Sequence, residues 1–294
     1  MNESAMKIKD GPSWVGLGHR EQLSSWIRTM PPEVECLEIT AEHFFDGGRE
    51  YLAWLAGRYP LFVHGLGLSL GTPGPLDAET LRSFAEVVEV AEPEWISEHI
   101  AFTWTEEVDL GHLNPVVPCA ESLSMIAAHA RQLAEHCGRP VILENITSHL
   151  RLEGDMEEAD FLNGICEQGD CGLLLDITNL FINSRNHGFD PVAWLQNVDP
   201  RFIVQCHVVG YGYRDGTWHD SHAAAIQEDL WELIEAVASY APLRSIIIER
   251  DGDFPPNAEL AAELRRLRQV LKSNGPDTKP VAAAGEARPA EEAG

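Results

Sequence analysis

Histidine and acidic residues stand at the ends of short apolar runs throughout this chain. Six consecutive runs end in such a residue, and the six are His64, His99, Glu144, Asp176, His207 and Glu249. One His or Asp in this position usually caps a helix or faces solvent, but six in succession are not independent accidents. Imidazole and carboxylate ligands without cysteine suit iron, manganese or zinc. If the six side chains converge, close carboxylates could not all ionise without a multivalent cation, so the pattern predicts a metal centre.

A further pair of candidate ligands lies in the segment WHDSH, which contains Asp220 and His222. Residues two apart in an extended segment point to the same side, so both side chains could face the same centre. A turn Asp beside a surface His is the alternative interpretation of this pair. With these two, the candidates outnumber the ligands that one ion needs, and we expect two or three ions bridged by a carboxylate.

The elements that must position these residues are eight apolar runs bounded by polar residues. Several are nearly continuous Val, Ile and Leu, as in VILEN, GLLLD and SIIIER, which is typical of parallel strands buried on both faces. The predicted strands span residues 14–18, 34–40, 61–64, 95–99, 141–145, 173–176, 202–207 and 245–249.

Helical stretches with an apolar spacing of about 3.6 residues separate these runs. They span residues 77–90, 121–137, 156–166, 191–198, 222–240 and 258–271. Strand and helix alternating within about 250 residues predict a (β/α)8 barrel of the α/β class, with a doubly wound open sheet as the alternative. Active sites of such barrels lie at the carboxyl ends of the strands, where the six residues would meet.

Two segments fall outside this regular pattern. Residues 183–191 indicate a polar loop, from which His187 could reach the centre. Residues 273–294 are rich in Ala, Pro and Glu and have almost no large apolar residue, which predicts a disordered tail. We therefore expect one barrel domain over residues 1–272, followed by this tail.

Composition and charge narrow the classes of function. The chain has 294 residues, 44% hydrophobic and 23% charged, close to the average of soluble globular proteins. The sequence has neither an apolar stretch of about 18 residues nor the apolar core of a signal peptide, so we expect a cytoplasmic protein. The formal net charge of −26 would repel nucleic acid and anionic membranes, so neither is expected as a partner.

Lysine and cysteine usage restricts the chemistry further. Lysine is absent from residues 10–271, which excludes Schiff-base catalysis and a GK[ST] phosphate-binding loop within that range. The six cysteines include no C-x-x-C pair, so we expect them to be reduced thiols.

The candidate ligands lie in segments that resemble one known family, the multinuclear non-haem iron-dependent oxidases. This family includes the enzymes of methanobactin and thiaglutamate biosynthesis. The resemblance extends roughly from Val15 to Pro256, and it rests on the motifs VGLGHR, LEITAEHFFDGG, FVHGLGLSLG, ISEHIAFT, ILENITSHL, LLLDITNLFINSRNHGFDP, CHVVGY, WHDSH and IIIERDGDFP.

The resemblance implies a xylose-isomerase-like TIM barrel that binds two or three iron ions, mixed Fe(II) and Fe(III), at its mouth. His64, His99 and Glu144 match the ligands of one iron, and Glu144, as the bridge, matches a second iron with Asp176, His207 and Glu249. Asp220 and His222 match a third site, and Asn179 occupies a position where some relatives have histidine. The catalytic residues are then expected to be Glu144, His99 and Asp176.

The implied reaction is a four-electron oxidation, with O2 as co-substrate, of a residue in a ribosomally synthesised precursor peptide. The usual target in the family is cysteine, and a small partner protein usually binds the leader peptide. Two alternatives remain open at this point. One is a divalent-metal-dependent isomerase or hydrolase on the same barrel plan, and the other is a metal-binding or peptide-binding module without catalysis.

Overall fold

The computed structural model describes residue 8 and residues 11–105 and 108–274. The last helix, α9 (Asn257–Asn274), includes the first two residues of the predicted tail. The remainder of that predicted tail lies outside the described residues. No helix within the described part of the chain is long and apolar enough to cross a membrane.

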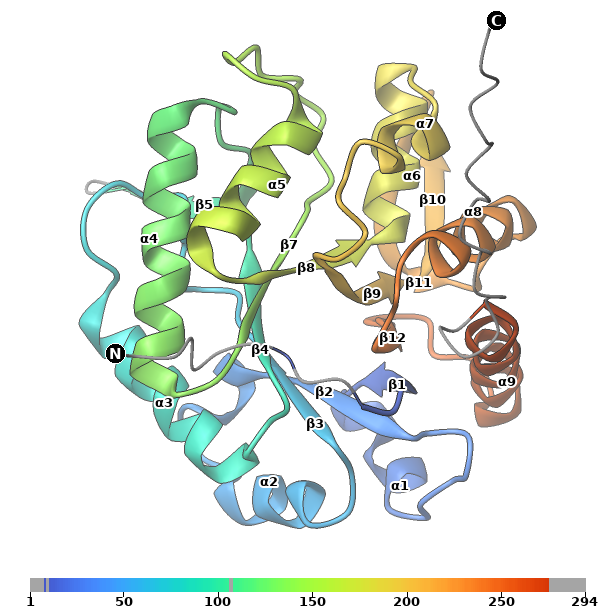
Figure 1. The fold of residues 1–294 in the computed structure, drawn as a ribbon. Helices are drawn as coiled ribbons and strands as arrows, with labels where there is room; N and C mark the ends of the chain where they lie inside the picture. Colours follow the sequence, from blue (N-terminus) through green and yellow to red (C-terminus); the bar gives the residue numbers. More distant parts are fainter. Residues whose placement is uncertain (1–7, 9–10, 106–107, 275–294) are drawn as a thin grey trace, which may run out of the picture.

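Eight parallel strands close into a barrel in the order β1-β12-β9-β8-β7-β4-β3-β2 (Figure 1). The predicted barrel is therefore confirmed, and the alternative open sheet is wrong. The strands are β1 (Trp14–Gly18), β2 (Cys36–Thr40), β3 (Leu61–His64), β4 (Ile96–His99), β7 (Val141–Glu144), β8 (Gly172–Asp176), β9 (Ile203–Val208) and β12 (Ser245–Ile248). Each strand begins and ends within two residues of a predicted strand. The agreement is close because strands buried on both faces are nearly continuous apolar runs in the sequence.

The barrel interior near the amino ends of the strands, which we call the lower layer, is apolar. Trp95 stacks on Phe62 at a centroid distance of 4.3 Å, and Trp14 meets the Phe62 ring edge-on at 5.9 Å. Gly16 permits close approach of β1 to β2, because a Cβ there would lie 2.2 Å from the carbonyl oxygen of Cys36. The buried members of this lower layer are Cys36, Phe62, Trp95, Ile142, Leu174, Val204 and Ile247.

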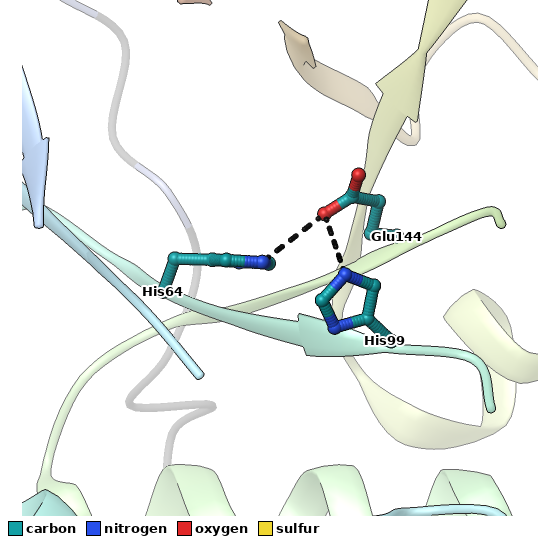
Figure 2. Close-up of side chains that lie close together, drawn as sticks. All are labelled: His64, His99 and Glu144. Carbon is teal, nitrogen blue, oxygen red and sulfur yellow. Dashed lines mark ion pairs between the residues drawn. The ribbon is translucent and has the colours of Figure 1, made fainter. Parts of the chain in front are cut away.

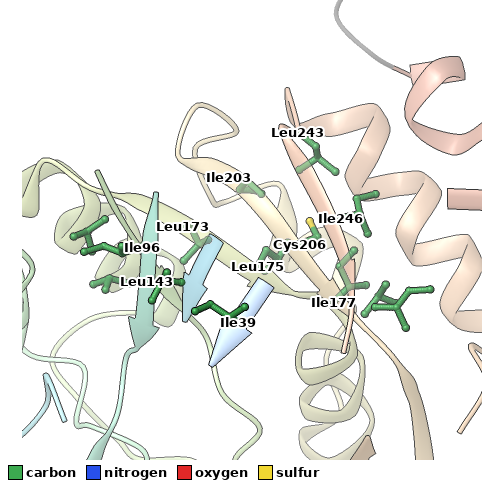
Figure 3. Packing of buried hydrophobic residues seen from close by; sticks show 14 of the residues in the cluster. Ile39, Ile96, Leu143, Leu173, Leu175, Ile177, Ile203, Cys206, Leu243 and Ile246 are labelled. Carbon is green, nitrogen blue, oxygen red and sulfur yellow. The ribbon is translucent and has the colours of Figure 1, made fainter. Parts of the chain in front are cut away.

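Helices cover the outside of the barrel, and their apolar faces pack on the outward side chains of the strands (Figure 3). The α-helices besides α9 are α1 (Ser24–Ile27), α2 (Arg49–Ala56), α3 (Ala78–Ala91), α4 (Ala120–Cys137), α5 (Glu158–Gly169), α6 (Ile177–His187), α7 (Pro191–Leu195) and α8 (Glu228–Tyr240). Two 3-10 turns, η1 (Glu21–Leu23) and η2 (Ala41–Phe44), follow β1 and β2 closely.

Two hairpins at the mouth of the barrel were not predicted. They are β5 (Phe102–Trp104) with β6 (Asp109–Asn114), and β10 (Gly210–Arg214) with β11 (Thr217–Ala224). The start of the predicted helix 222–240 is wrong, because residues 222–224 belong to β11 and α8 begins at Glu228.

The predicted loop at 183–191 is helical over its first five residues, which form the end of α6. Polar residues face inward there: Asn183 accepts a hydrogen bond from the Ser148 N–H at 2.9 Å and donates to the Ile146 carbonyl at 2.9 Å. His187 Nε2 lies 2.7 Å from the Ser148 carbonyl oxygen. That contact ties His187 to the loop after β7, and His187 belongs to none of the ligand groups described below.

Candidate metal centre

Imidazoles from β3 and β4 meet one carboxylate at the mouth of the barrel. His64 Nε2 lies 3.4 Å, and His99 Nε2 3.5 Å, from the same oxygen, Oε2 of Glu144 (Figure 2). All three side chains are buried, and one ligand atom from each lies within 4.8 Å of the others. This geometry can hold one ion between two imidazoles and a carboxylate.

A second group shares Glu144. Glu144, Asp176, His207 and Glu249 also bring one ligand atom each within 4.8 Å of the others. His207 Nδ1 lies 3.3 Å from Glu144 Oε1 and 3.2 Å from Glu249 Oε2. The two oxygens of Glu144 therefore face different groups, which is the arrangement that a bridging carboxylate requires.

Strand register explains why residues so distant in sequence meet. In the barrel, His99 on β4 is paired with Glu144 on β7, and Asp176 on β8 is paired with His207 on β9. Asp176 is also the N-cap of α6, and its Oδ1 accepts the Asn179 N–H at 2.7 Å. That bond fixes the carboxylate at the start of the helix and uses one of its oxygens.

Each of the three imidazoles has one nitrogen toward the centre and the other beside a supporting side chain. His64 Nδ1 lies 2.8 Å from Ser97 Oγ, and His99 Nδ1 lies 3.4 Å from Glu98 Oε2. Such supporting groups fix the tautomer and the ring orientation of metal-bound histidines. Glu98 ends a predicted strand, but nothing in the spacing of the sequence assigned it this role.

His207 has the most elaborate support. Its Nε2 lies 2.6 Å from Glu38 Oε1, and the Gln205 amide donates to Glu38 Oε2 at 2.5 Å. Trp95 Nε1 donates to Gln205 Oε1 at 2.8 Å. These contacts form a hydrogen-bonded series, Trp95–Gln205–Glu38–His207, that connects the candidate centre to the apolar lower layer.

The predicted third site is arranged differently from the expectation. His222 Nε2 lies 2.5 Å from Asp220 Oδ2, so the WHDSH pair does face one way, in β11. The group of ligand atoms found there, however, joins His222 and Glu249 to Asp251, whose Oδ2 is 3.0 Å from His222 Nδ1. Asp251 was missed, although it follows Glu249 at the same two-residue spacing that marks Asp220 and His222.

Asn179 and Asp220 belong to none of the three ligand groups within the described residues, and their role as ligands stays a prediction. Asn179 accepts a hydrogen bond from the Thr147 hydroxyl and donates to the Asn145 carbonyl at 3.2 Å. Arg20, which follows β1, also reaches this side of the mouth. It pairs with Glu249 at 3.0 Å and with Asp251.

Unpartnered polar atoms test whether the site fits a cation. Buried polar atoms without a partner are rare and costly in folded proteins. Two gather here within the described residues, Glu144 Oε2 and His207 Nδ1, and an ion between the ligand groups would satisfy both. The donor set of imidazole and carboxylate fits iron, manganese or zinc.

The pKa values of the clustered side chains also indicate that the site suits a cation. Burial opposes protonation of His99, but Glu144 and Glu98 outweigh it and raise its pKa to about 9. Burial likewise opposes protonation of His207, yet Glu38 and Glu144 raise its pKa well above the usual value. Burial, then Glu144, raises the pKa of Asp176 well above its usual range. Protons thus neutralise the cluster in the absence of an ion, and cation binding must release them.

A pocket of about 1090 Å³ opens above these groups. His99, Glu144, His222 and Glu249 contribute to its lining, so the candidate centre is reachable from outside although its ligands are mostly buried. A site with buried ligands under an open pocket suits chemistry on a bound substrate better than a purely structural ion.

Solved structures with the same fold carry varied activities. The E. coli 3-keto-D-glucoside 4-epimerase YcjR is 14% identical with a TM-score of 0.56, covering 87% of this chain and 99% of that one. Endonuclease IV from Thermus thermophilus is 15% identical with a TM-score of 0.56, covering 88% and 99%. At such low identity these structures support the xylose-isomerase-like barrel alone.

Relatives by sequence identify the family of the chain. A UPF0276 protein of Bordetella parapertussis is 35% identical over 269 residues, covering 88% of this chain and 93% of that protein. A UPF0276 protein of Chromobacterium violaceum is 32% identical over 269 residues, covering 90% and 98%. The family model described as "RiPP precursor modification enzyme MbnB/TglH/ChrH", where RiPP denotes a ribosomally synthesised and post-translationally modified peptide, matches residues 14–272. The chain therefore belongs to the MbnB/TglH/ChrH family of RiPP precursor modification enzymes.

Proposed function

We propose that this protein is a multinuclear, iron-dependent oxidase that uses O2 to modify a residue, in the first instance cysteine, of a ribosomal precursor peptide. The observation that carries the proposal is the sharing of Glu144 by two ligand groups under an open pocket. Family membership supplies the class of substrate, a RiPP precursor. The cytoplasmic location and a small leader-binding partner protein stay predictions.

In this proposal His64, His99 and Glu144 hold one iron, and Glu144, Asp176, His207 and Glu249 hold another. The ions would supply one-electron redox chemistry and O2 activation. A four-electron oxidation of the peptide matches the four electrons that reduce O2 to two waters, so no further reductant is needed for the balance.

The protein's own residues have positioning and charge roles in this scheme. Glu38, Ser97 and Glu98 hold the three imidazoles in place through their outer nitrogens. Arg20 neutralises part of the acidic rim through Glu249. The pocket, at about 1090 Å³, has room for several peptide residues above the ligands.

A divalent-metal-dependent isomerase or hydrolase is the second candidate, because the same barrel carries epimerases and an endonuclease. The absence of lysine from residues 10–271 removes a residue that could polarise a sugar carbonyl. The net charge of −26 disfavours a nucleic-acid substrate.

The deciding experiment co-expresses the protein with short cysteine-containing peptides encoded near its gene and measures the masses of those peptides. Iron-loaded protein in air should change the peptide mass and consume O2, whereas anaerobic or zinc-loaded protein should leave the mass unchanged. Turnover by zinc-loaded protein without O2 would support the hydrolase or isomerase instead. An unaltered peptide that still binds would indicate a binding module.

A further inference from the structure

The pocket above the candidate centre is lined by side chains of different chemistry. Three of its lining side chains are apolar, Leu66 and Ile146 from loops and Leu113 from β6. A group of basic and aromatic lining residues, which we call the cationic wall, comes from the segments after β1 and β2. Its members are His19, Arg20, Arg28, His43 and Tyr51. The chain has 47 acidic and 21 basic residues, so this grouping of basic side chains beside the candidate centre runs against the overall charge.

Arg28 is the arginine of this wall that forms no ion pair among the described residues. Its guanidinium lies over the Tyr51 ring at 4.4 Å and over the Trp54 ring at 5.2 Å. No ion pair among the described residues includes Arg28, whereas Arg20 pairs with two acids, Glu249 and Asp251. Stacking holds a guanidinium in a fixed plane and leaves its N–H edge available for a planar, bidentate acceptor.

The neighbours of Arg28 favour an anion at this place. Burial, followed by Arg20, His43 and Arg28, lowers the pKa of His19 to about 4, so its imidazole is neutral at pH 7 and adds polarity without charge. Tyr51 lies beneath Arg28, and its hydroxyl is 3.1 Å from His19 Nε2. The exposed acid Glu21 also lines the pocket, but it forms no ion pair with Arg28.

We propose that the cationic wall, through Arg28, binds a carboxylate of the peptide substrate while the residue to be modified lies over the metal ligands. The carboxylate belongs either to the C-terminus of the peptide or to an Asp or Glu side chain close to the modified residue. The assignment of a peptide as the ligand rests on the proposed function. The assignment of a carboxylate rests on the wall itself.

The test measures binding of short probe peptides by calorimetry to zinc-loaded protein without O2, so that no turnover occurs. One series is acetyl-Cys-(Gly)n with a free C-terminal acid or an amide, where n runs from one to three. A second pair is acetyl-Cys-Gly-Asp-Gly-amide and its Asn counterpart, which tests a side-chain carboxylate. A third series replaces Cys by Ala, so that carboxylate binding is measured apart from the thiol.

The wild type should bind the acid of at least one pair about tenfold more tightly than its neutral counterpart, as one charge-assisted bidentate contact allows. Arg28→Gln should reduce this ratio to about one. Arg58→Gln is the matched control, because Arg58 stacks on the same Trp54 ring at 4.3 Å but does not line the pocket. Both arginines are exposed, and melting temperatures close to wild type would verify that both variants fold.

Equal binding of acid and neutral probes, absence of binding by all of them, or a ratio unchanged in Arg28→Gln would overturn the carboxylate site. A preference in the C-terminal series alone assigns the terminal carboxylate, and one in the Asp pair alone assigns a side chain. If the Ala series keeps the acid preference while Cys adds no affinity, the carboxylate site stands and the cysteine part of the proposed function fails.

Discussion

The lower and upper halves of the barrel interior are built on the same strands but have opposite chemistry. Each residue of the lower layer and its partner at the mouth are two positions apart in the sequence, so both side chains point into the barrel. The pairs from lower layer to mouth are Cys36 and Glu38, Phe62 and His64, Trp95 and Ser97, Ile142 and Glu144, Leu174 and Asp176, and Ile247 and Glu249.

The difference between the halves separates stability from function. The lower layer is closely packed by rings and aliphatic chains, and its burial stabilises the closed barrel. The mouth instead gathers buried charges and unpartnered polar atoms, which cost free energy unless a cation is present. The lower half therefore supports an upper half that would not be stable alone, and changes in the two halves should have separable effects.

The largest effect is expected at the shared ligand of the mouth. Glu144→Ala removes the carboxylate that contacts both ligand groups, so metal affinity should fall by more than about 100-fold and turnover should be lost. Metal analysis and the peptide mass assay measure both, and the circular dichroism spectrum should remain that of a folded barrel. An iron-loaded Glu144→Ala protein that still turns over would disprove the bridging role.

The opposite pattern is expected in the lower layer. Phe62→Ala leaves a cavity beside Trp95 and should reduce the free energy of unfolding by about 3–5 kcal/mol. Denaturant titration measures this loss, and the number of ions bound per folded chain should not change. Loss of metal at a temperature where the variant is still folded would mean that the two halves are not separable.

Glu38→Gln tests the boundary between the halves. The variant keeps the shape of the side chain but removes the negative charge beside His207 Nε2, so metal affinity should fall about 10- to 100-fold. Competition with a coloured chelator measures the affinity. Glu86→Gln is the control, since Glu86 pairs with Arg49 on the surface, and it should leave the affinity at the wild-type value.

The smallest expected effect concerns pH. The His19 pKa is about 4 in the folded protein and about 6.5 when unfolded, so protonation favours the unfolded chain and stability falls as pH decreases through this window. Between pH 7 and 5.5, His19 should contribute a loss of about 1 kcal/mol. His19→Asn should lack this loss when both metal-free proteins are titrated with denaturant. The same pH slope in the variant would assign the sensitivity to other residues.

Sequence patterns predicted the barrel and the meeting of the candidate ligands at its mouth, because both follow from the strands. Runs such as VILE and GLLLD are buried on both faces, and His64, His99, Glu144, Asp176 and His207 are the last or nearly last residues of strands. Once the barrel closes, the register leaves little freedom in where these side chains lie.

Elements without such a signal were missed. The end of α6 carries Asn183 and Ser184 on a buried face, so its apolar spacing is interrupted and resembles a loop. The hairpin β10–β11 is half-buried over most of its length and has no apolar run. The roles of Glu38 and Arg20 depend on contacts across the barrel with His207 and Glu249, which spacing along the chain does not reveal.

The barrel closes only when its last strand, β12, pairs with its first strand, β1 (Figure 1). The ligand groups draw on β3 near the start of the chain and on Glu249 directly after β12. A ribosome must therefore release most of the polypeptide before the last ligand can join the first. If these groups hold ions as proposed, the ions can be inserted only late in biosynthesis, because a nascent fragment that ends before the last strand lacks part of the ligand set.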